Sequence, residues 1–332
     1  ERVLALTGHL SNVIENHVAD GSRWGLDVTY MREETPRGTA GALRDAADHL
    51  EATFLLVYGD VLFNLDLARF IAAGKANGGL GTLFVHPNDH PTDSDLVVMD
   101  GQGRVKAFHP KPHPSGLLVR NRANAALHFF DKAIVHWIEE SQEAVDLGRD
   151  VLPRAARFGA KLHAYNSAEY IKDIGTPERL ARAEAALRVG EVAAKSYSNR
   201  QRAVFIDRDG VINRELDGIT RPDDLDVLPG VAAAIGALNR STFLAIVATN
   251  QPLIAKGFAT EGEVDAVHAA LDNALAEEGA YLDDLMMCPH HPESGHDGEV
   301  EILKVVCQCR KPQPGMLFEA AARHNIDLER SF

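Results

Sequence analysis

Basic residues and long apolar runs are both scarce in this sequence. Lysine and arginine total 34 against 48 aspartates and glutamates, and the net charge of −14 with no basic block argues against a general nucleic-acid surface. No apolar run approaches the roughly 20 residues that a membrane-spanning helix needs, and no signal-peptide pattern opens the chain. We therefore expect a cytoplasmic protein that binds neither nucleic acid nor a membrane.

Cysteine is rarer still, and its placement is informative. All three cysteines fall between residues 288 and 309, which suits a metal site better than a disulfide framework. Cys288 and His290 form one pair, and Cys307 and Cys309 form a second pair further along. Three sulfurs and one imidazole make a closed tetrahedral set, the arrangement typical of structural zinc. Free cysteines are often small buried hydrophobes, but their confinement to this window favours zinc.

The remaining composition is that of a globular protein with room for two domains. Strand and helix patterns alternate through both halves, which predicts the α/β class with two doubly wound domains. We expect domains at 1–190 and 202–332, joined by a polar, weakly patterned linker at 191–201. The chain opens at Glu1 without a methionine and ends at Phe332 where a new strand would start, so we expect a fragment truncated at both ends.

Periodicity and capping residues predict the individual elements. Strands are expected at 3–7, 27–31, 54–58, 80–85, 124–130, 161–166, 203–206, 243–248 and 282–287, with a hairpin at 96–108. Helices are expected at 12–20 after a Ser11 cap, 42–49, 67–77, 132–140, 150–158, 178–187 after a Thr176 cap, 231–239, and 261–278 with a capping box from Thr260 and Glu263.

Two carboxylates, Asp207 and Asp209, directly follow the buried strand 203–206. In an open α/β sheet the carboxyl ends of the strands line the ligand crevice, and on an extended backbone an i, i+2 pair points to one side. Two anions this close repel each other unless a cation lies between them. Taken alone, the spacing equally fits a solvated turn.

Two later stretches favour a site over a turn. Thr249-Asn250-Gln251 ends the strand 243–248, and Arg310-Lys311-Pro312 precedes a predicted helix. This order resembles that of haloacid-dehalogenase-type phosphatases, in which a carboxylate attacks phosphorus with the help of Mg²⁺. The resemblance implies these roles: Asp207 as nucleophile, Asp209 for the leaving-group proton, Thr249 and Lys311 on the phosphoryl oxygens, Asp207 and Asp209 on magnesium, and Asn250 and Arg310 in substrate binding.

The zinc pattern narrows this resemblance. Together with the strand-end motifs, it is similar to D-glycero-D-manno-heptose 1,7-bisphosphate phosphatases over residues 202–332. Histidinol-phosphate phosphatases share the zinc loop and stay open as an alternative. The last metal-binding acidic motif of both families, usually a Gly-Asp after a further strand, is missing from this sequence.

The first half resembles sugar-phosphate nucleotidyltransferases over residues 1–188, a family with a Rossmann-like domain. Four motifs carry the likeness: Gly38-Thr39-Ala40-Gly41, Gly59-Asp60, Lys111-Pro112 and Asp173-Ile174-Gly175-Thr176-Pro177. The resemblance implies that 38–41 form the base-side loop, that Asp60 and Asp173 hold Mg²⁺, and that Lys111 meets the sugar phosphate. Such a set suits the chemistry, because attack of one phosphate on another brings anions together.

Three departures from that family affect the expected specificity. The opening Gly-rich loop with its arginine is absent, Pro110 stands where an acid usually precedes Lys-Pro, and Gly148 stands where many relatives carry a sugar-binding glutamate. A guanine nucleotide is expected by resemblance only.

The two resemblances combine into one expected function. One half would remove the 7-phosphate of the heptose bisphosphate, and the other would join the resulting heptose 1-phosphate to a nucleoside triphosphate. Sugar phosphates and a nucleoside triphosphate are then the binding partners, and Mg²⁺ and Zn²⁺ the metals. The alternatives are a histidinol-phosphate phosphatase fused to the transferase, and a phosphatase with a non-catalytic sugar-nucleotide-binding module.

Overall fold

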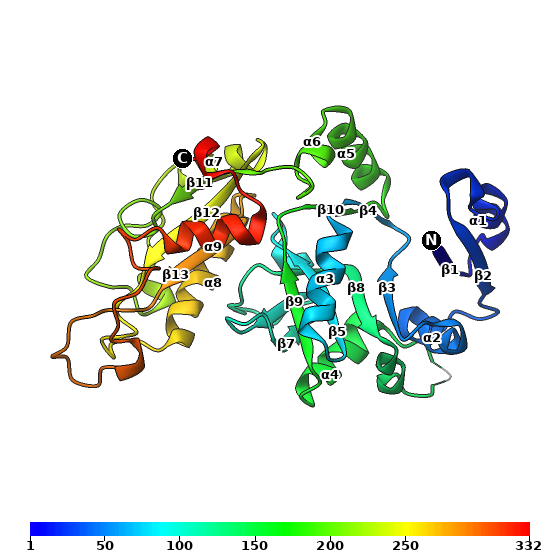
Figure 1. Cartoon of the computed structure of the whole chain (residues 1–332), viewed down its shortest axis with the longest axis horizontal. Helices are drawn as coiled ribbons and strands as arrows, with labels where there is room; N and C mark the ends of the chain where they lie inside the picture. Colours follow the sequence, from blue (N-terminus) through cyan, green and yellow to red (C-terminus); the bar gives the residue numbers. More distant parts are fainter. Residues whose placement is uncertain (142) are drawn as a thin grey trace.

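A computed structural model describes residues 1–141 and 143–332 and has the α/β class expected from the sequence (Figure 1). Strands β1 (Arg2–Thr7) and β2 (Asp27–Arg32) pair in parallel as a two-stranded sheet of their own, with α1 (Ser11–Val18) between them in sequence. This unit lies at the right of Figure 1, and the elements of residues 202–332 lie at the left. The predicted Ser11 cap is wrong: Leu10, in the left-handed region, precedes the helix, and Ser11 is its first residue.

The central sheet of the first half has six strands, in the order β7-β6-β8-β5-β9, with β3 on β8. Their bounds are β3 Thr53–Val57, β5 Gly81–His86, β6 Leu96–Met99, β7 Val105–His109, β8 Ala123–Asp131 and β9 Leu162–Asn166. A doubly wound domain, as expected here, has a mostly parallel sheet, but β3 pairs antiparallel with β8, as β5 does. Among the strand pairs of this sheet in the described residues, β5–β9 is the parallel one and the others are antiparallel, so the sheet is mixed.

Alternation along β5 shows why helices cover both faces of this sheet. Phe84 packs with Phe70 of α3 (Leu67–Asn77) in one buried cluster. Its neighbours Leu83 and Val85 pack with Leu152 of α4 (Leu152–Arg157) in another. Successive side chains of a strand point to opposite faces, so one short apolar run serves two cores.

Two short strands and a helix complete the first half. Strand β4 (Val61–Asn64) pairs antiparallel with β10 (Tyr170–Asp173). Helix α5 (Pro177–Arg188) starts as predicted, with the Thr176 side chain accepting a 3.3 Å hydrogen bond from the Arg179 amide.

Three helix predictions in this half need correction. Helix α2 (Gly38–Asp45) starts at Gly38 and not at Ala42, because the 38–40 backbone docks on the segment at Val145: the Ala40 amide donates to Val145 O at 3.0 Å. The expected helix 132–140 is a 3₁₀ helix at Lys132–Trp137, consistent with its weak helix formers. The expected helix 150–158 begins as a π turn at Leu147–Val151, ahead of α4.

The second half contains a parallel sheet in the order β11-β12-β13, with bounds Arg202–Ile206, Phe243–Asn250 and Asp284–Cys288. Its helices are α7 (Val231–Asn239), α8 (Glu261–Glu277) and α9 (Gly315–His324). Ile246 packs with Met316 of α9, whereas the adjacent Val247 packs with Leu271 of α8, so helices cover both faces as expected. The capping box of Thr260 and Glu263 is confirmed.

The segment assigned as the linker is folded and packed. It contains α6 (Glu191–Ala194), and Tyr197 is buried. The Tyr197 hydroxyl accepts a 2.9 Å hydrogen bond from the Ala168 amide and lies 2.5 Å from Nδ1 of His324 on α9. The chain between the two halves is therefore anchored to both. Within 1–141 and 143–332, no helix has the length and apolar character needed to cross a membrane.

Candidate active sites and metal centre

The carboxyl ends of β11 and β12 bring Asp207 next to Lys311. The Lys311 ammonium lies 2.6 Å from Asp207 Oδ2 and donates to the carbonyl of Ala248 at 2.8 Å. The Asp207 side chain stays 45% exposed. An accessible carboxylate thus lies beside a cation that can neutralise an incoming phosphoryl group.

Asn250 holds the backbone of Lys311 through both of its amide atoms. Its Oδ1 accepts from the Lys311 amide at 2.9 Å, and its Nδ2 donates to the Lys311 carbonyl at 3.2 Å. In this structure Asn250 therefore positions the lysine. Its predicted contact with substrate stays a prediction.

Neighbouring side chains hold Asp209. We expected an extended backbone through Asp209, but strand β11 ends at Ile206. Arg208, fully buried, donates to both carboxylate oxygens of Asp209 at 2.8–3.1 Å. Asn213 Nδ2 donates to Oδ1 at 3.1 Å, and Gln251 Nε2 donates to Oδ2 at 2.8 Å. The Gln251 amide also reaches the buried Thr249 hydroxyl at 2.9 Å. Of the two predicted magnesium ligands, Asp207 is thus the one with the more accessible carboxylate.

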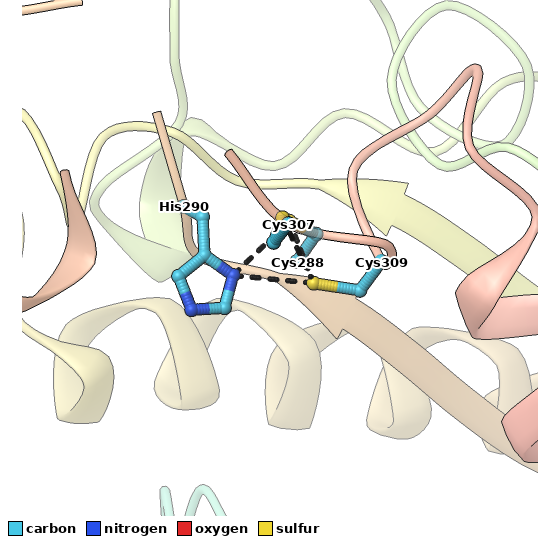
Figure 2. Close-up of side chains that lie close together, drawn as sticks. All are labelled: Cys288, His290, Cys307 and Cys309. Atoms are coloured by element: carbon cyan, nitrogen blue, oxygen red, sulfur yellow. Dashed lines mark hydrogen bonds between the residues drawn. The ribbon is translucent and has the colours of Figure 1, made fainter. Parts of the chain in front are cut away.

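The four predicted zinc ligands meet at the end of β13. Cys288, His290, Cys307 and Cys309 point toward one another in Figure 2, and one ligand atom from each lies within 4.8 Å of all the others. Five pairs of these ligand atoms lie 3.1–3.6 Å apart. With metal–sulfur bonds of ~2.3 Å, ligands at the corners of a tetrahedron lie about 3.5–3.8 Å apart. The residues therefore fit a bound zinc ion.

In this structure Arg310 contacts the segment that carries the four predicted zinc ligands. Its Nη1 donates to the carbonyl of His290 at 3.3 Å. The contact ties the metal loop to the residue before Lys311, and the predicted role of Arg310 in substrate binding stays a prediction.

In the first half, Asp60 and Asp173 converge at Gly175. The Ile174 amide donates to the Asp60 carbonyl at 2.7 Å, and the Gly175 amide donates to Asp173 Oδ1 at 2.6 Å. A Cβ at Gly175 would lie 3.1 Å from Asp173 Oδ1 and 3.4 Å from Asp60 Oδ2. Two carboxylate oxygens, one from the turn between β3 and β4 and one from the end of β10, therefore flank one small space, which fits a divalent cation with oxygen ligands.

A row of alternating charges leads from this pair to Lys111. Arg179 of α5 lies 2.7 Å from Asp173 Oδ2 and 3.7 Å from Asp93. Asp93 in turn accepts from the Lys111 ammonium at 3.1 Å, and this hydrogen bond holds the pKa of Asp93 below its usual value. The Lys111 amide donates to Asp95 Oδ1 at 3.0 Å. The predicted metal ligands and the predicted phosphate ligand thus belong to one connected group.

The 38–41 motif packs against the segment at Val145 and Asp146 and is buried or half-buried. Ala40 and Gly41 are buried, and a Cβ at Gly38, whose φ is +74°, would lie 2.5 Å from Val145 O. The Thr39 hydroxyl donates to Asp146 at 3.0 Å. Nearby, burial raises the pKa of Tyr58 to about 12, so its hydroxyl stays protonated. Close packing against Val145 therefore explains why a glycine stands at position 38, independently of any contact with a nucleobase.

Sequence reasoning missed four residues that organise the two sites. Gln251 was quoted only as part of a strand-end motif, and Arg208 only as part of the acidic turn. Arg179, six residues after Asp173 and inside the first turns of α5, offered a weak signal as a cation near a metal ligand. Asp93 offered none, because only the fold brings it to Lys111.

Comparison with known proteins adds independent findings. A family model described as "Nucleotidyl transferase" matches residues 1–189. A protein of Rhodopseudomonas palustris named D-glycero-beta-D-manno-heptose-1,7-bisphosphate 7-phosphatase is 39% identical over 133 residues, which cover 40% of this chain and 72% of the relative. A protein of the same name from Escherichia coli strain K12 is 38% identical over 130 residues, which cover 39% of this chain and 66% of the relative.

A solved structure is similar as well. It is described as D,D-heptose 1.7-bisphosphate phosphatase from B. bronchiseptica complexed with magnesium and phosphate, and it is 36% identical with a TM-score of 0.33. The match covers 39% of this chain and 65% of that one.

Proposed function

The chain belongs to the nucleotidyl transferase family through residues 1–189 and to the D-glycero-beta-D-manno-heptose-1,7-bisphosphate 7-phosphatases through a 133-residue match, and on this premise we propose that it carries out two consecutive reactions. The first removes the 7-phosphate from the bisphosphate. The second transfers a nucleotidyl group to the resulting heptose 1-phosphate. The observation that carries the proposal is that one chain contains two such sites. In one, Asp207 forms an ion pair with Lys311, and in the other, the carboxylates of Asp60 and Asp173 flank the same space.

In the phosphatase reaction, Asp207 attacks the phosphorus atom and forms an aspartyl-phosphate, while the bond to the sugar oxygen breaks. Asp209 gives that oxygen a proton and then accepts one from the water that hydrolyses the intermediate. Lys311 and Thr249 hold the phosphoryl oxygens. Arg208 and Gln251 keep the Asp209 carboxyl group in place. A bound magnesium ion, with Asp207 as its more accessible ligand, would offset the phosphate charge.

In the transfer reaction, the sugar phosphate attacks the α-phosphorus of the nucleoside triphosphate and pyrophosphate leaves. Lys111 holds the attacking phosphate, and Asp93 orients the lysine in the absence of that phosphate. Asp60 and Asp173 would hold a magnesium ion that supplies charge neutralisation between the two anions. The 38–41 segment is proposed to lie at the base, with guanine as the first candidate.

Paired product assays on the full-length protein test this proposal. With the heptose bisphosphate alone, phosphate should appear, and pyrophosphate should follow only when a nucleoside triphosphate is added. Phosphate release from histidinol phosphate with none from the heptose would favour the alternative substrate. Nucleotide binding without pyrophosphate release, for every nucleobase, would favour the non-catalytic module.

We further propose that Cys288, His290, Cys307 and Cys309 bind one structural zinc ion. Elemental analysis should find about one zinc per chain. Cys307→Ser should lose the metal and lower Tm by roughly 5 °C or more, because metal binding contributes to the folding free energy. His296→Asn, in the same loop but outside the cluster, is the matched control and should keep the bound zinc and the parent Tm. Purified protein without zinc, and a Cys307→Ser variant as stable as the parent, would rule the site out.

A further inference from the structure

A buried carboxylate of the second half contacts the first half at one point. Asp272 lies on α8 and is 4% exposed; its Oδ2 accepts from Arg120 Nε at 2.6 Å and from the Asn121 amide at 3.0 Å. Arg120 is 9% exposed, so the ion pair is shielded from water. The carbonyl of Leu117 accepts a further bond from Asn273 at 3.3 Å. Helix α8 therefore holds the part of the 110–122 segment just before β8.

From Asn121 the hydrogen bonds continue into the first half. Asn121 Nδ2 donates to the Asn88 carbonyl at 2.6 Å, and its Oδ1 accepts from the Asn88 amide at 3.2 Å. Asn88 Nδ2 then donates to Ser94 Oγ at 2.9 Å. Asn88 and Asn121 are both buried, so the amide of each is committed to this path.

The path ends at the lysine proposed to hold the sugar phosphate. Ser94 stands between Asp93, which binds the Lys111 ammonium, and Asp95, which binds the Lys111 backbone amide. Lys111 is itself on the surface, with its side chain 47% exposed. Both ends of its loop are thus fixed, at one end by Asp93 and Asp95 and at the other by Asp272.

We propose that Asp272, a residue of the phosphatase half, is a positioning residue for nucleotidyl transfer. It orders the 110–122 segment and, through Asn121 and Asn88, the Asp93–Asp95 segment. Lys111 is thereby positioned for the sugar phosphate before the sugar phosphate binds. A long, exposed lysine side chain loses conformational entropy when it is fixed, and a prearranged loop removes that cost from substrate binding. The inference rests on the proposed transferase function.

Kinetics of the full-length protein test the proposal with two variants. Asp272→Asn removes the buried carboxylate charge that lies 2.6 Å from Arg120, and Asn121→Ala removes the side-chain hydrogen bonds to Asn88 while the ion pair stays. Each should raise KM for heptose 1-phosphate about tenfold, with KM for the nucleoside triphosphate and kcat changed less than about twofold. Phosphate release from the heptose bisphosphate should stay at the parent rate.

Asp265→Asn is the matched control, because Asp265 lies on the same helix, faces Arg120 at 3.6 Å and is 54% exposed. It should leave KM for the sugar phosphate unchanged. Equal KM values for parent, Asp272→Asn and Asn121→Ala would overturn the proposal, as would equal rises in KM for both substrates.

Amide hydrogen exchange gives a readout that needs no catalysis. Residues 91–95 and 113–121 should exchange faster in both variants than in the parent, and at the parent rate in Asp265→Asn. Unchanged exchange in both variants would defeat the ordering role. If the parent released no pyrophosphate, the proposed transfer would fail by itself, and the exchange rates would still decide whether Asp272 orders this loop.

Discussion

Replacing Asp207 with asparagine is expected to abolish phosphate release from the heptose bisphosphate, with a loss of roughly 10⁴-fold or more, as for other enzymes that lose their nucleophile. The amide has nearly the same shape but cannot attack phosphorus or carry the charge that Lys311 pairs with at 2.6 Å. Steady-state phosphate release by the full-length protein measures the effect. Asp209→Asn should also be severely impaired, while substrate binding is largely retained.

The control for this series is Asp223→Asn, an acid of the same half whose side chain is 84% exposed and which pairs with the surface residue Arg221. It should match the parent in rate, because surface ion pairs contribute little. Substantial phosphate release by Asp207→Asn would remove the aspartyl-phosphate mechanism from consideration.

Asp173→Ala is expected to stop nucleotide-sugar formation, lowering pyrophosphate release by about 10³-fold, since a metal ion supplies several kcal/mol of charge stabilisation in such reactions. The variant removes one of the two carboxylates that flank the space at Gly175. It also removes the nearer of the two carboxylates beside Arg179, at 2.7 Å, and leaves Asp93 at 3.7 Å. Pyrophosphate release from heptose 1-phosphate and nucleoside triphosphate is the measurement.

Phosphate release serves as the internal check on this variant. It should stay near the parent value, because distant sites without shared partners rarely couple strongly. Asp207→Asn should do the reverse and keep pyrophosphate release. Glu184→Ala, on the exposed face of α5, is the control for changes in that helix. Full pyrophosphate release by Asp173→Ala would contradict the assigned transferase site, and loss of both reactions in a folded variant would contradict two separate sites.

These expectations and the proposed role of Asp272 are compatible, because they concern different residues. Asp207 is proposed to act on the phosphate in one site, and Asp173 is proposed to hold the metal ion in the other. Asp272 touches neither, and reaches Lys111 only through buried hydrogen bonds that pass Asn121 and Asn88. The two halves should therefore be separable at their reacting residues and coupled at their interface.

Most of the local structure follows from short stretches of neighbouring residues. A short apolar run followed by an acid is sufficient to predict β11 and the strand-end position of Asp207, because side-chain periodicity and a polar stop are properties of adjacent residues. The capping box of α8 and the Thr176 cap are equally local. The spacing of Cys288, His290, Cys307 and Cys309 predicted a cluster that the fold does bring together.

Which distant groups meet depends on how the elements pack in the folded chain. The antiparallel pairing of β3 with β8, the start of α2 at Gly38 against Val145, and the enclosure of Asp209 by Arg208 and Gln251 each depend on contacts outside the local pattern. The same holds for the link from Asp93 to Lys111 and for the reach of Asp272 across the two halves. Local propensity and periodicity act over a few residues, whereas these contacts join segments that are adjacent only after the chain has folded.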